Sequence, residues 1–180
     1  IRSNRAVRPT IAGTLVLGRE PQRVFPQASV RVVSYRGTSR ETGARSNIEG
    51  DRRFDGPLPQ LIDEAGDTLR GWLPRAIRLE PKGRFAEATM IPEFAWLEAL
   101  VNAVVHRSYS LGGDHVRVEL FDDRVEVESP GRLPGLVRIE SIRSTRFARN
   151  PRIARAMSDL GYGRELGEGV DRMFQEMQRV

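Results

Sequence analysis

The feature that most constrains the fold is a polar stripe along an apolar segment, residues 98–109. The polar positions recur at helical spacing: Glu98, Asn102, His106 and Tyr109. At about 100° per residue, these four side chains fall within about 80° of one another. The adjacent face is apolar and carries Leu97, Leu100, Val101, Val104 and Val105. The segment therefore predicts a helix that packs on a core through one face and turns the stripe elsewhere.

Two interpretations of the stripe stay open from periodicity alone. A solvated face of an amphipathic helix gives the same pattern as a helix that lines a pocket. If the stripe lines a pocket, a carboxylate and an amide one turn apart (Glu98 and Asn102) suit a base beside a neutral oxygen ligand. A phosphate bound through a metal ion, with its attacking water, needs that combination.

The segments after the stripe predict an antiparallel hairpin followed by two helices. Residues 115–121 and 124–128 both alternate apolar and polar residues, and Asp122-Asp123 separates them. Asn150-Pro151 predicts the capped start of a helix that ends at Gly161. A last helix is expected from about residue 165, with an apolar face of Val170, Met173, Phe174 and Met177.

The first half of the chain predicts a looser arrangement. We expect a short helix over residues 11–17, a strand over 29–35 and a helix over 57–73. Residues 37–56 contain few large apolar side chains and are expected to form a loop. Residues 81–87 are expected to be a second connector.

Positive charge is concentrated near the N-terminus. Residues 1–56 hold 11 Arg against 5 acidic residues, residues 57–92 hold 5 basic and 5 acidic residues, and residues 93–180 hold 13 Arg against 14 acidic residues. An arginine excess of this kind is typical of proteins that bind a phosphate backbone. The alternative is that arginine is simply the preferred cation, because Lys82 is the only lysine.

A second group of arginines lies between residues 138 and 155, where six arginines face a single acid, Glu140. This group is either a nucleic-acid surface or an ordinary solvated face. The candidate nucleic-acid contacts are Arg143, Arg146, Arg149 and Arg152. No apolar run approaches the roughly 18 residues of a membrane span, so we expect no membrane contact and a cytoplasmic location. Without cysteine and with two histidines, we expect no structural metal site.

Five motifs occur in a specific order in the last half of the chain: EALVNAVVHRSYS (98–110), SPGRLP (129–134), RNPRIA (149–154), LGY (160–162) and ELGEGVDRM (165–173). In this order they resemble the C-terminal domain of RecG-related ATP-dependent DNA helicases and transcriptional regulators. That domain is a divergent branch of the GHKL, or Bergerat-fold, nucleotide-binding proteins. Residues 10–37 look like the closing part of a Schlafen-type AlbA-like DNA-binding domain.

The resemblance implies an ATP and Mg²⁺ site on the polar stripe. Glu98 would polarise the attacking water, Asn102 would hold Mg²⁺ on the phosphates, and Gly167 with Gly169 would hold phosphate at a helix start. The cofactor-binding candidates are Asn102, His106, Ser129, Gly131, Gly167 and Gly169. Three positions depart from the family pattern: Ser129 and Ser108 stand where acidic residues are expected, and Leu133 replaces the second glycine of its loop.

These observations predict an α+β fold, a two-layer mixed sheet with helices on one face in the GHKL manner, plus a partial α/β N-terminal domain. The expected divisions are residues 1–56, 57–91 and 92–180. The expected function is a DNA-binding, transcriptional-regulator-like protein with a degenerate ATP-binding module. The alternatives are an active Mg²⁺-dependent ATPase with Glu98 as base, or a non-catalytic module that forms a homodimer. No P-loop motif is present, so no helicase motor is expected.

Overall fold

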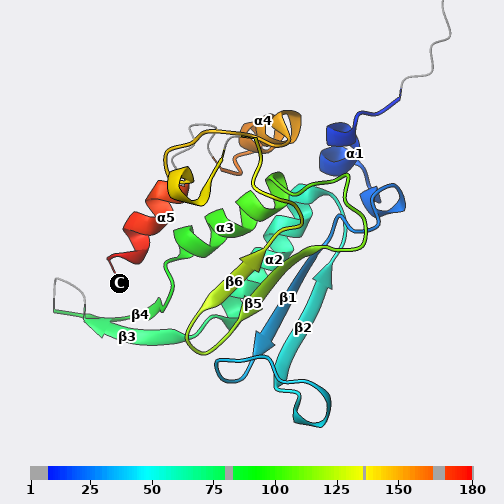
Figure 1. Ribbon diagram of the computed structural model, residues 1–180. Coiled ribbons are helices and arrows are strands. Elements are labelled where there is room, and N and C mark those ends of the chain that lie inside the picture. The colour runs from blue at the N-terminus through cyan, green and yellow to red at the C-terminus, as the bar shows by residue number, and fades with distance from the viewer. Residues whose placement is uncertain (1–7, 80–82, 136, 164–168, 180) are drawn as a thin grey trace, which may run out of the picture.

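The computed structural model describes residues 8–79, 83–135, 137–163 and 169–179 (Figure 1). The helices of this part of the chain are α1 (Ile11–Leu17), α2 (Leu58–Trp72), α3 (Glu93–Val105), α4 (Pro151–Asp159) and α5 (Gly169–Met177). The strands are β1 (Val30–Tyr35), β2 (Ile48–Phe54), β3 (Arg75–Leu79), β4 (Phe85–Thr89), β5 (Val116–Leu120) and β6 (Val125–Glu128).

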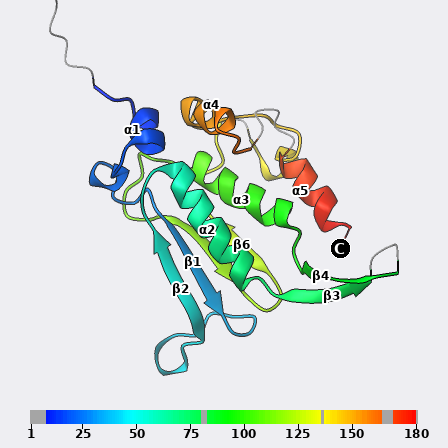
Figure 2. The ribbon, with the colours of Figure 1, turned by 180° about the vertical axis from the view of Figure 1, so that it is seen from behind.

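Four strands form one mixed sheet in the order β2-β1-β5-β6. Strand β1 is antiparallel to β2 and parallel to β5, and β5 is antiparallel to β6. Helices α2 and α3 cover one face of this sheet, and α4 and α5 lie beyond α3 (Figures 1 and 2). Strands β3 and β4 form a separate hairpin that stands out from the body. The prediction of an α+β fold with a mixed sheet is confirmed.

The core lies between the sheet and these two helices. Alternate residues of β1 and β5, among them Val30, Val32 and Val118, are fully buried because they face the helices. Leu61 and Leu69 of α2 meet them, together with the apolar face of α3. Each such side chain contributes about 1.5–3 kcal/mol through burial. This packing holds α3 in place with its polar stripe turned away from the sheet.

Several sequence predictions are confirmed, among them helix α1, helix α2, strand β1 and the β5–β6 hairpin. The loop predicted for residues 37–56 is wrong in part, because it contains β2. Most β2 side chains are exposed, so the strand shows no apolar alternation. Backbone pairing to β1 and surface ion pairs such as Arg31–Asp51 hold it instead. The connector predicted for residues 81–87 also contains the start of β4.

Strands from the two ends of the chain share one sheet. Both β1 and β2 belong to residues 1–56, and both β5 and β6 belong to residues 92–180. Residues 1–56 and residues 92–180 thus share one sheet and one hydrophobic core. The division of the chain into three units stays a prediction. Within the described part of the chain, no helix combines the length and the apolar character that crossing a membrane requires.

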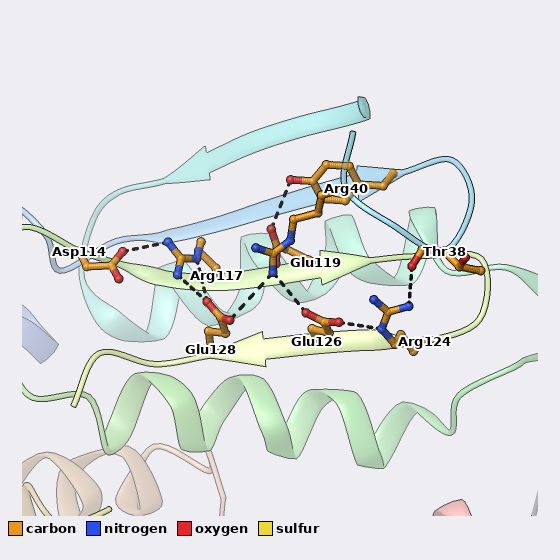
Figure 3. Close-up of polar contacts among 9 residues, drawn as sticks. Thr38, Arg40, Asp114, Arg117, Glu119, Arg124, Glu126 and Glu128 are labelled. Carbon is orange, nitrogen blue, oxygen red and sulfur yellow. Dashed lines mark hydrogen bonds and ion pairs between the residues drawn. The ribbon is translucent and has the colours of Figure 1, made fainter. Parts of the chain in front are cut away.

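The sheet face opposite the helices carries a network of ion pairs (Figure 3). Glu119 of β5 is 3% exposed and accepts a hydrogen bond from the Tyr35 hydroxyl at 3.3 Å. Arg40 reaches over the sheet from the loop after β1 and pairs with Glu119, and its Nη2 lies 3.2 Å from Glu126 Oε2. A buried carboxylate is costly unless a cation and hydrogen bonds satisfy it. The ion pairs of Arg40 thus hold the loop after β1 against this face of the sheet.

We expect Arg40→Met to lower the free energy of unfolding by about 2 kcal/mol, because it leaves Glu119 buried without its cation. Urea denaturation followed by circular dichroism measures the change. The matched control is Arg36→Met, since Arg36 pairs with Glu49 on the surface and such pairs contribute about 0–1 kcal/mol. Equal losses in the two variants would show that burial of Glu119 has no energetic consequence.

Candidate functional site

The polar stripe of α3 lines a cavity of about 390 Å³. Glu98, Asn102 and His106 form one wall, and the opposite walls come from residues 145–148, α4, Tyr162-Gly163 and the first turn of α5. The stripe therefore faces a cavity rather than open solvent. Tyr109 lies beyond the end of α3 and turns elsewhere, since its hydroxyl donates a hydrogen bond to the Val104 carbonyl at 2.9 Å.

Glu98 and Asn102 contact each other on the cavity wall. The Asn102 amide nitrogen donates a hydrogen bond to Glu98 Oε1 at 3.0 Å, which leaves the amide oxygen of Asn102 free of that bond. Burial raises the pKa of the Glu98 carboxyl, although the Asn102 hydrogen bond and the charge of Arg172 act against this shift. The cavity wall thus holds a carboxyl group whose neutral form is favoured by burial, beside an amide group.

His106 follows the last turn of α3 and is half-buried. Burial lowers the pKa of its imidazole, and the nearby charge of Arg149 lowers it further, so the ring is neutral near pH 7. Its Nδ1 atom is buried and has no hydrogen-bond partner within the described structure. Folded proteins leave few buried polar atoms unpaired, but this atom has almost no accessible surface, so it is not open to a partner in the cavity.

Glycine at position 169 keeps the cavity open at the start of α5. A β-carbon there would lie 2.7 Å from Cδ of Glu98, closer than any relaxed contact. Gly163 on the same side of the cavity has φ +73°, a backbone conformation that favours glycine. Gly167, the other glycine predicted to contact phosphate, lies outside the described residues.

Ser129 and Gly131 do not line this cavity. The Ser129 hydroxyl donates a hydrogen bond to the Ala103 carbonyl at 2.7 Å, so it satisfies the last turn of α3. Gly131 has φ +132° and packs closely against Ser108 and the guanidinium of Arg149. Both residues of the 129–134 motif therefore support the end of the stripe-bearing helix, and their contact with a cofactor remains a prediction.

Two residues near the cavity have structural roles that the sequence did not reveal. Asn150 occupies the N-cap position of α4, but its side chain does not cap that helix. Its amide donates hydrogen bonds to the carbonyls of Val105 and Arg107, both at 2.8 Å, and so ties α4 to the end of α3. Arg107 is 2% exposed and donates hydrogen bonds to the backbone carbonyls of Leu111 and Asp114.

The four arginines predicted to contact nucleic acid have different surroundings. Arg143 pairs with Asp171 of α5, with Nη2 at 2.5 Å from Oδ1. Arg149 donates to the backbone carbonyl of residue 132. Arg146 is exposed and lines the cavity beside the stripe, and Arg152 is exposed on α4. Of the four, Arg146 is the cation that the structure brings to the cavity.

Tyr162 is a wall residue that was seen in the sequence only as part of the 160–162 motif. Its hydroxyl donates a hydrogen bond to Asp63 of α2 at 2.7 Å, and burial with this carboxylate raises the pKa of Tyr162 to about 12. On its other side lies a larger cavity of about 680 Å³, between α2, α3 and α5. Glu98, Tyr162 and Gly169 line both cavities, so the two spaces adjoin.

The shifted pKa of Glu98 predicts a stability effect. A carboxyl group whose pKa is raised by folding is protonated more readily in the folded state than in the unfolded state. The stability that this difference contributes is lost as the pH rises through the pKa of Glu98 in the folded protein. Glutamine stays neutral and can still accept the Asn102 hydrogen bond. Glu98→Gln should therefore raise the melting temperature at about pH 8, and the gain should vanish at about pH 4.

Thermal unfolding followed by circular dichroism across this pH range measures the gain. Glu41→Gln is the matched control, because Glu41 is exposed in the loop after β1. A gain for Glu98→Gln that is the same at both ends of the pH range would contradict the assigned burial of the Glu98 charge.

A match to a known family covers the last part of the chain and does not include the stripe-bearing helix α3. The family model described as "Putative ATP-dependent DNA helicase recG C-terminal" matches residues 113–180, which include β5, β6, α4 and α5. These residues are thus similar to the C-terminal part of RecG-related proteins. The GHKL assignment of the stripe and the AlbA-like assignment of the N-terminal segment stay predictions.

Among solved structures, the chain is similar to the crystal structure of the DIP2311 protein from Corynebacterium diphtheriae. The TM-score is 0.74 at 23% sequence identity, and the alignment covers 92% of this chain and 32% of that chain. The similarity shows a shared fold, and the chain spans about a third of the length of that protein. No curated protein matches the chain.

Proposed function

We propose that the cavity beside α3 binds ATP with Mg²⁺, in a module of a DNA-binding regulator that has lost efficient hydrolysis. The observation that carries this proposal is the convergence of Glu98, Asn102 and His106 on one cavity, opposite a glycine that keeps it open. The match of residues 113–180 to an ATPase-like family supports the choice of nucleotide.

The residues present fit a magnesium nucleotide. The free amide oxygen of Asn102 is a neutral ligand of the kind Mg²⁺ accepts, and the bound ion would neutralise phosphate charge. Arg146 adds a cation at the cavity wall.

One observation favours hydrolysis as a second candidate function. A general base works best when its pKa lies near the operating pH, and burial raises the pKa of Glu98. Against efficient turnover, Ser108 and Ser129 replace the acidic residues of the family pattern, and the Ser129 hydroxyl is used to satisfy α3. We therefore favour binding without efficient turnover.

Calorimetric titration with ATP and Mg²⁺ tests the proposal. We expect saturable binding at one site per chain, and weaker binding when EDTA removes the metal. If the titration shows no heat of binding even at high protein concentration, nucleotide binding is excluded. If the chain hydrolyses ATP, Glu98→Gln should abolish turnover and keep binding; equal rates in wild type and variant would rule out Glu98 as the base.

DNA contact is the second part of the proposal and rests on the arginine excess of residues 1–56. Several of these arginines are engaged in ion pairs, for example Arg31 with Asp51 and Arg36 with Glu49. We therefore expect weak binding that is strongest at low salt and falls steeply as salt rises. Fluorescence anisotropy with a labelled duplex measures it, and no binding at low salt would exclude DNA contact by this chain.

A further inference from the structure

The β3–β4 hairpin joins no other strand in the described part of the chain. Its two strands of five residues each pair only with one another, and both ribbon views show them standing out from the body (Figures 1 and 2). An isolated two-stranded hairpin is at best marginally stable in water, because it cannot bury its own apolar side chains. The hairpin is therefore a candidate for contact with another molecule.

One face of the hairpin carries two large apolar side chains in open solvent. Ile77 is 72% exposed and Phe85 is 75% exposed. The register places Ile77 opposite Glu87, and Phe85 lies two residues from Glu87 along β4, so Ile77 and Phe85 share a face as diagonal neighbours. Met90, directly after β4, adds an exposed apolar side chain at the base of the hairpin. Apolar surface thus extends from the tip of the hairpin to its base.

The charges described on this face balance one another. Arg75 shares the face with Ile77, and its Nη1 lies 3.6 Å from Oε2 of Glu87, with both side chains exposed. A nucleic acid requires a surplus of cations, which these two residues do not provide. A two-fold axis brings a surface against itself, so the surface must complement itself. Apolar side chains beside one cation and one anion meet this requirement.

Two hairpins can meet by their edges or by their faces, and only contact between faces buries the apolar side chains. Edge pairing would extend the sheet but leave Ile77 and Phe85 of both copies in solvent. Ile77 is the middle residue of β3, so a two-fold axis beside it sets two hairpins antiparallel with Ile77 on Ile77. The tip of each hairpin, at Phe85, then approaches Met90 at the base of the other, a favourable contact between sulfur and an aromatic ring.

We propose that the β3–β4 hairpin is a dimerisation arm, whose Ile77–Phe85 face packs on the same face of a second copy of this chain. The arm shares no residue with the cavity beside α3, so the proposal does not depend on nucleotide binding. Two five-residue strands form a small contact, and we therefore expect a dissociation constant of about 10–100 μM.

Sedimentation equilibrium between about 5 and 500 μM chain tests the proposal, and we expect the wild type to show a monomer–dimer equilibrium. Ile77→Glu sets two like charges together at the two-fold axis and should weaken association at least about thirtyfold. Its melting temperature should stay that of the wild type, because Ile77 lies outside the core. Ile139→Glu is the matched control, since Ile139 is 78% exposed outside the hairpin, and it should associate as wild type does.

A cysteine cross-link tests the contact at the two-fold axis directly. The chain contains no cysteine, so Ile77→Cys introduces a single thiol. A disulfide requires β-carbons about 4 Å apart, so mild oxidation should convert most of Ile77→Cys into a covalent dimer and little of Ile139→Cys.

Three results would overturn the dimerisation arm: a wild type that stays monomeric at the highest concentration, an Ile77→Glu variant that associates as wild type does, or equal cross-linking of the two cysteine variants. Loss of duplex DNA binding in Ile77→Glu, with every form monomeric, would also overturn it. The hairpin would then contact nucleic acid instead of a second copy.

Discussion

Replacing Arg107 by alanine is expected to lower the free energy of unfolding by about 3 kcal/mol or more. The side chain is 2% exposed and donates hydrogen bonds to the carbonyls of Ser108, Leu111 and Asp114, at 3.0, 3.0 and 2.7 Å. The three contacts are part-buried, and a fully buried carbonyl left without its donor costs about 1–3 kcal/mol. Since domains are stable by only about 5–15 kcal/mol, this single change should remove a large share of the total.

Urea denaturation of Arg107→Ala measures this effect, with Arg152→Ala as the control. Arg152 is exposed on α4, and such substitutions change stability by about 0.5 kcal/mol or less. Arg107→Lys should fall between the two, because one ammonium group cannot span three carbonyls. If Arg107→Ala unfolds at the same urea concentration as Arg152→Ala, the loop from Ser108 to Asp114 does not depend on this arginine.

Replacing Gly169 by valine is expected to weaken ATP binding about a hundredfold while the fold remains stable. The new β-carbon would lie 2.7 Å from Cδ of Glu98 and force this flexible carboxyl group aside, and the two added methyl groups would narrow the cavity. A hundredfold loss corresponds to about 2.7 kcal/mol of binding free energy. The new β-carbon meets side-chain atoms of Glu98 and no backbone atom, so the melting temperature should change little.

Calorimetric titration with ATP and Mg²⁺ compares Gly169→Val with Gly112→Val. Gly112 is exposed, and a β-carbon there meets nothing within 4 Å, so the control adds the same side chain without touching the cavity. Wild-type affinity in Gly169→Val would place the nucleotide elsewhere. A similar loss in both variants would show an indirect effect of valine on the fold.

The sequence predicted those parts of the fold in which burial imposes a period. The β5–β6 hairpin was predictable because Val116, Val118 and Leu120 face the helices at every second position. The α3 stripe was predictable because its apolar residues repeat at helical spacing against the same sheet. Strand β2 was missed because only Phe54 is buried in it, so its pairing to β1 leaves no apolar pattern.

The candidate site could be predicted in its residues but only partly in its geometry. Position along α3 already placed Glu98 and Asn102 one turn apart, and the structure joins them by a hydrogen bond. Contacts between distant segments leave no such signal. Asn150 donates a hydrogen bond to a backbone carbonyl at the end of α3, and Arg107 is buried among loop carbonyls. Both contacts depend on the paths of loops, which sequence periodicity does not encode.

The parallel pairing of β1 with β5 has a consequence for how the chain folds. Val30 pairs with Val116, and β2, α2, β3, β4 and α3 all lie between them in sequence. During synthesis β1 and β2 leave the ribosome long before β5, and an isolated two-stranded hairpin is at best marginally stable in water. The central strand pair therefore closes late, and such long-range pairing is typical of slow folding. Until β5 arrives, the backbone N–H and C=O groups on that edge of β1 have no strand to pair with, so a nascent chain that stops before residue 116 is prone to aggregate.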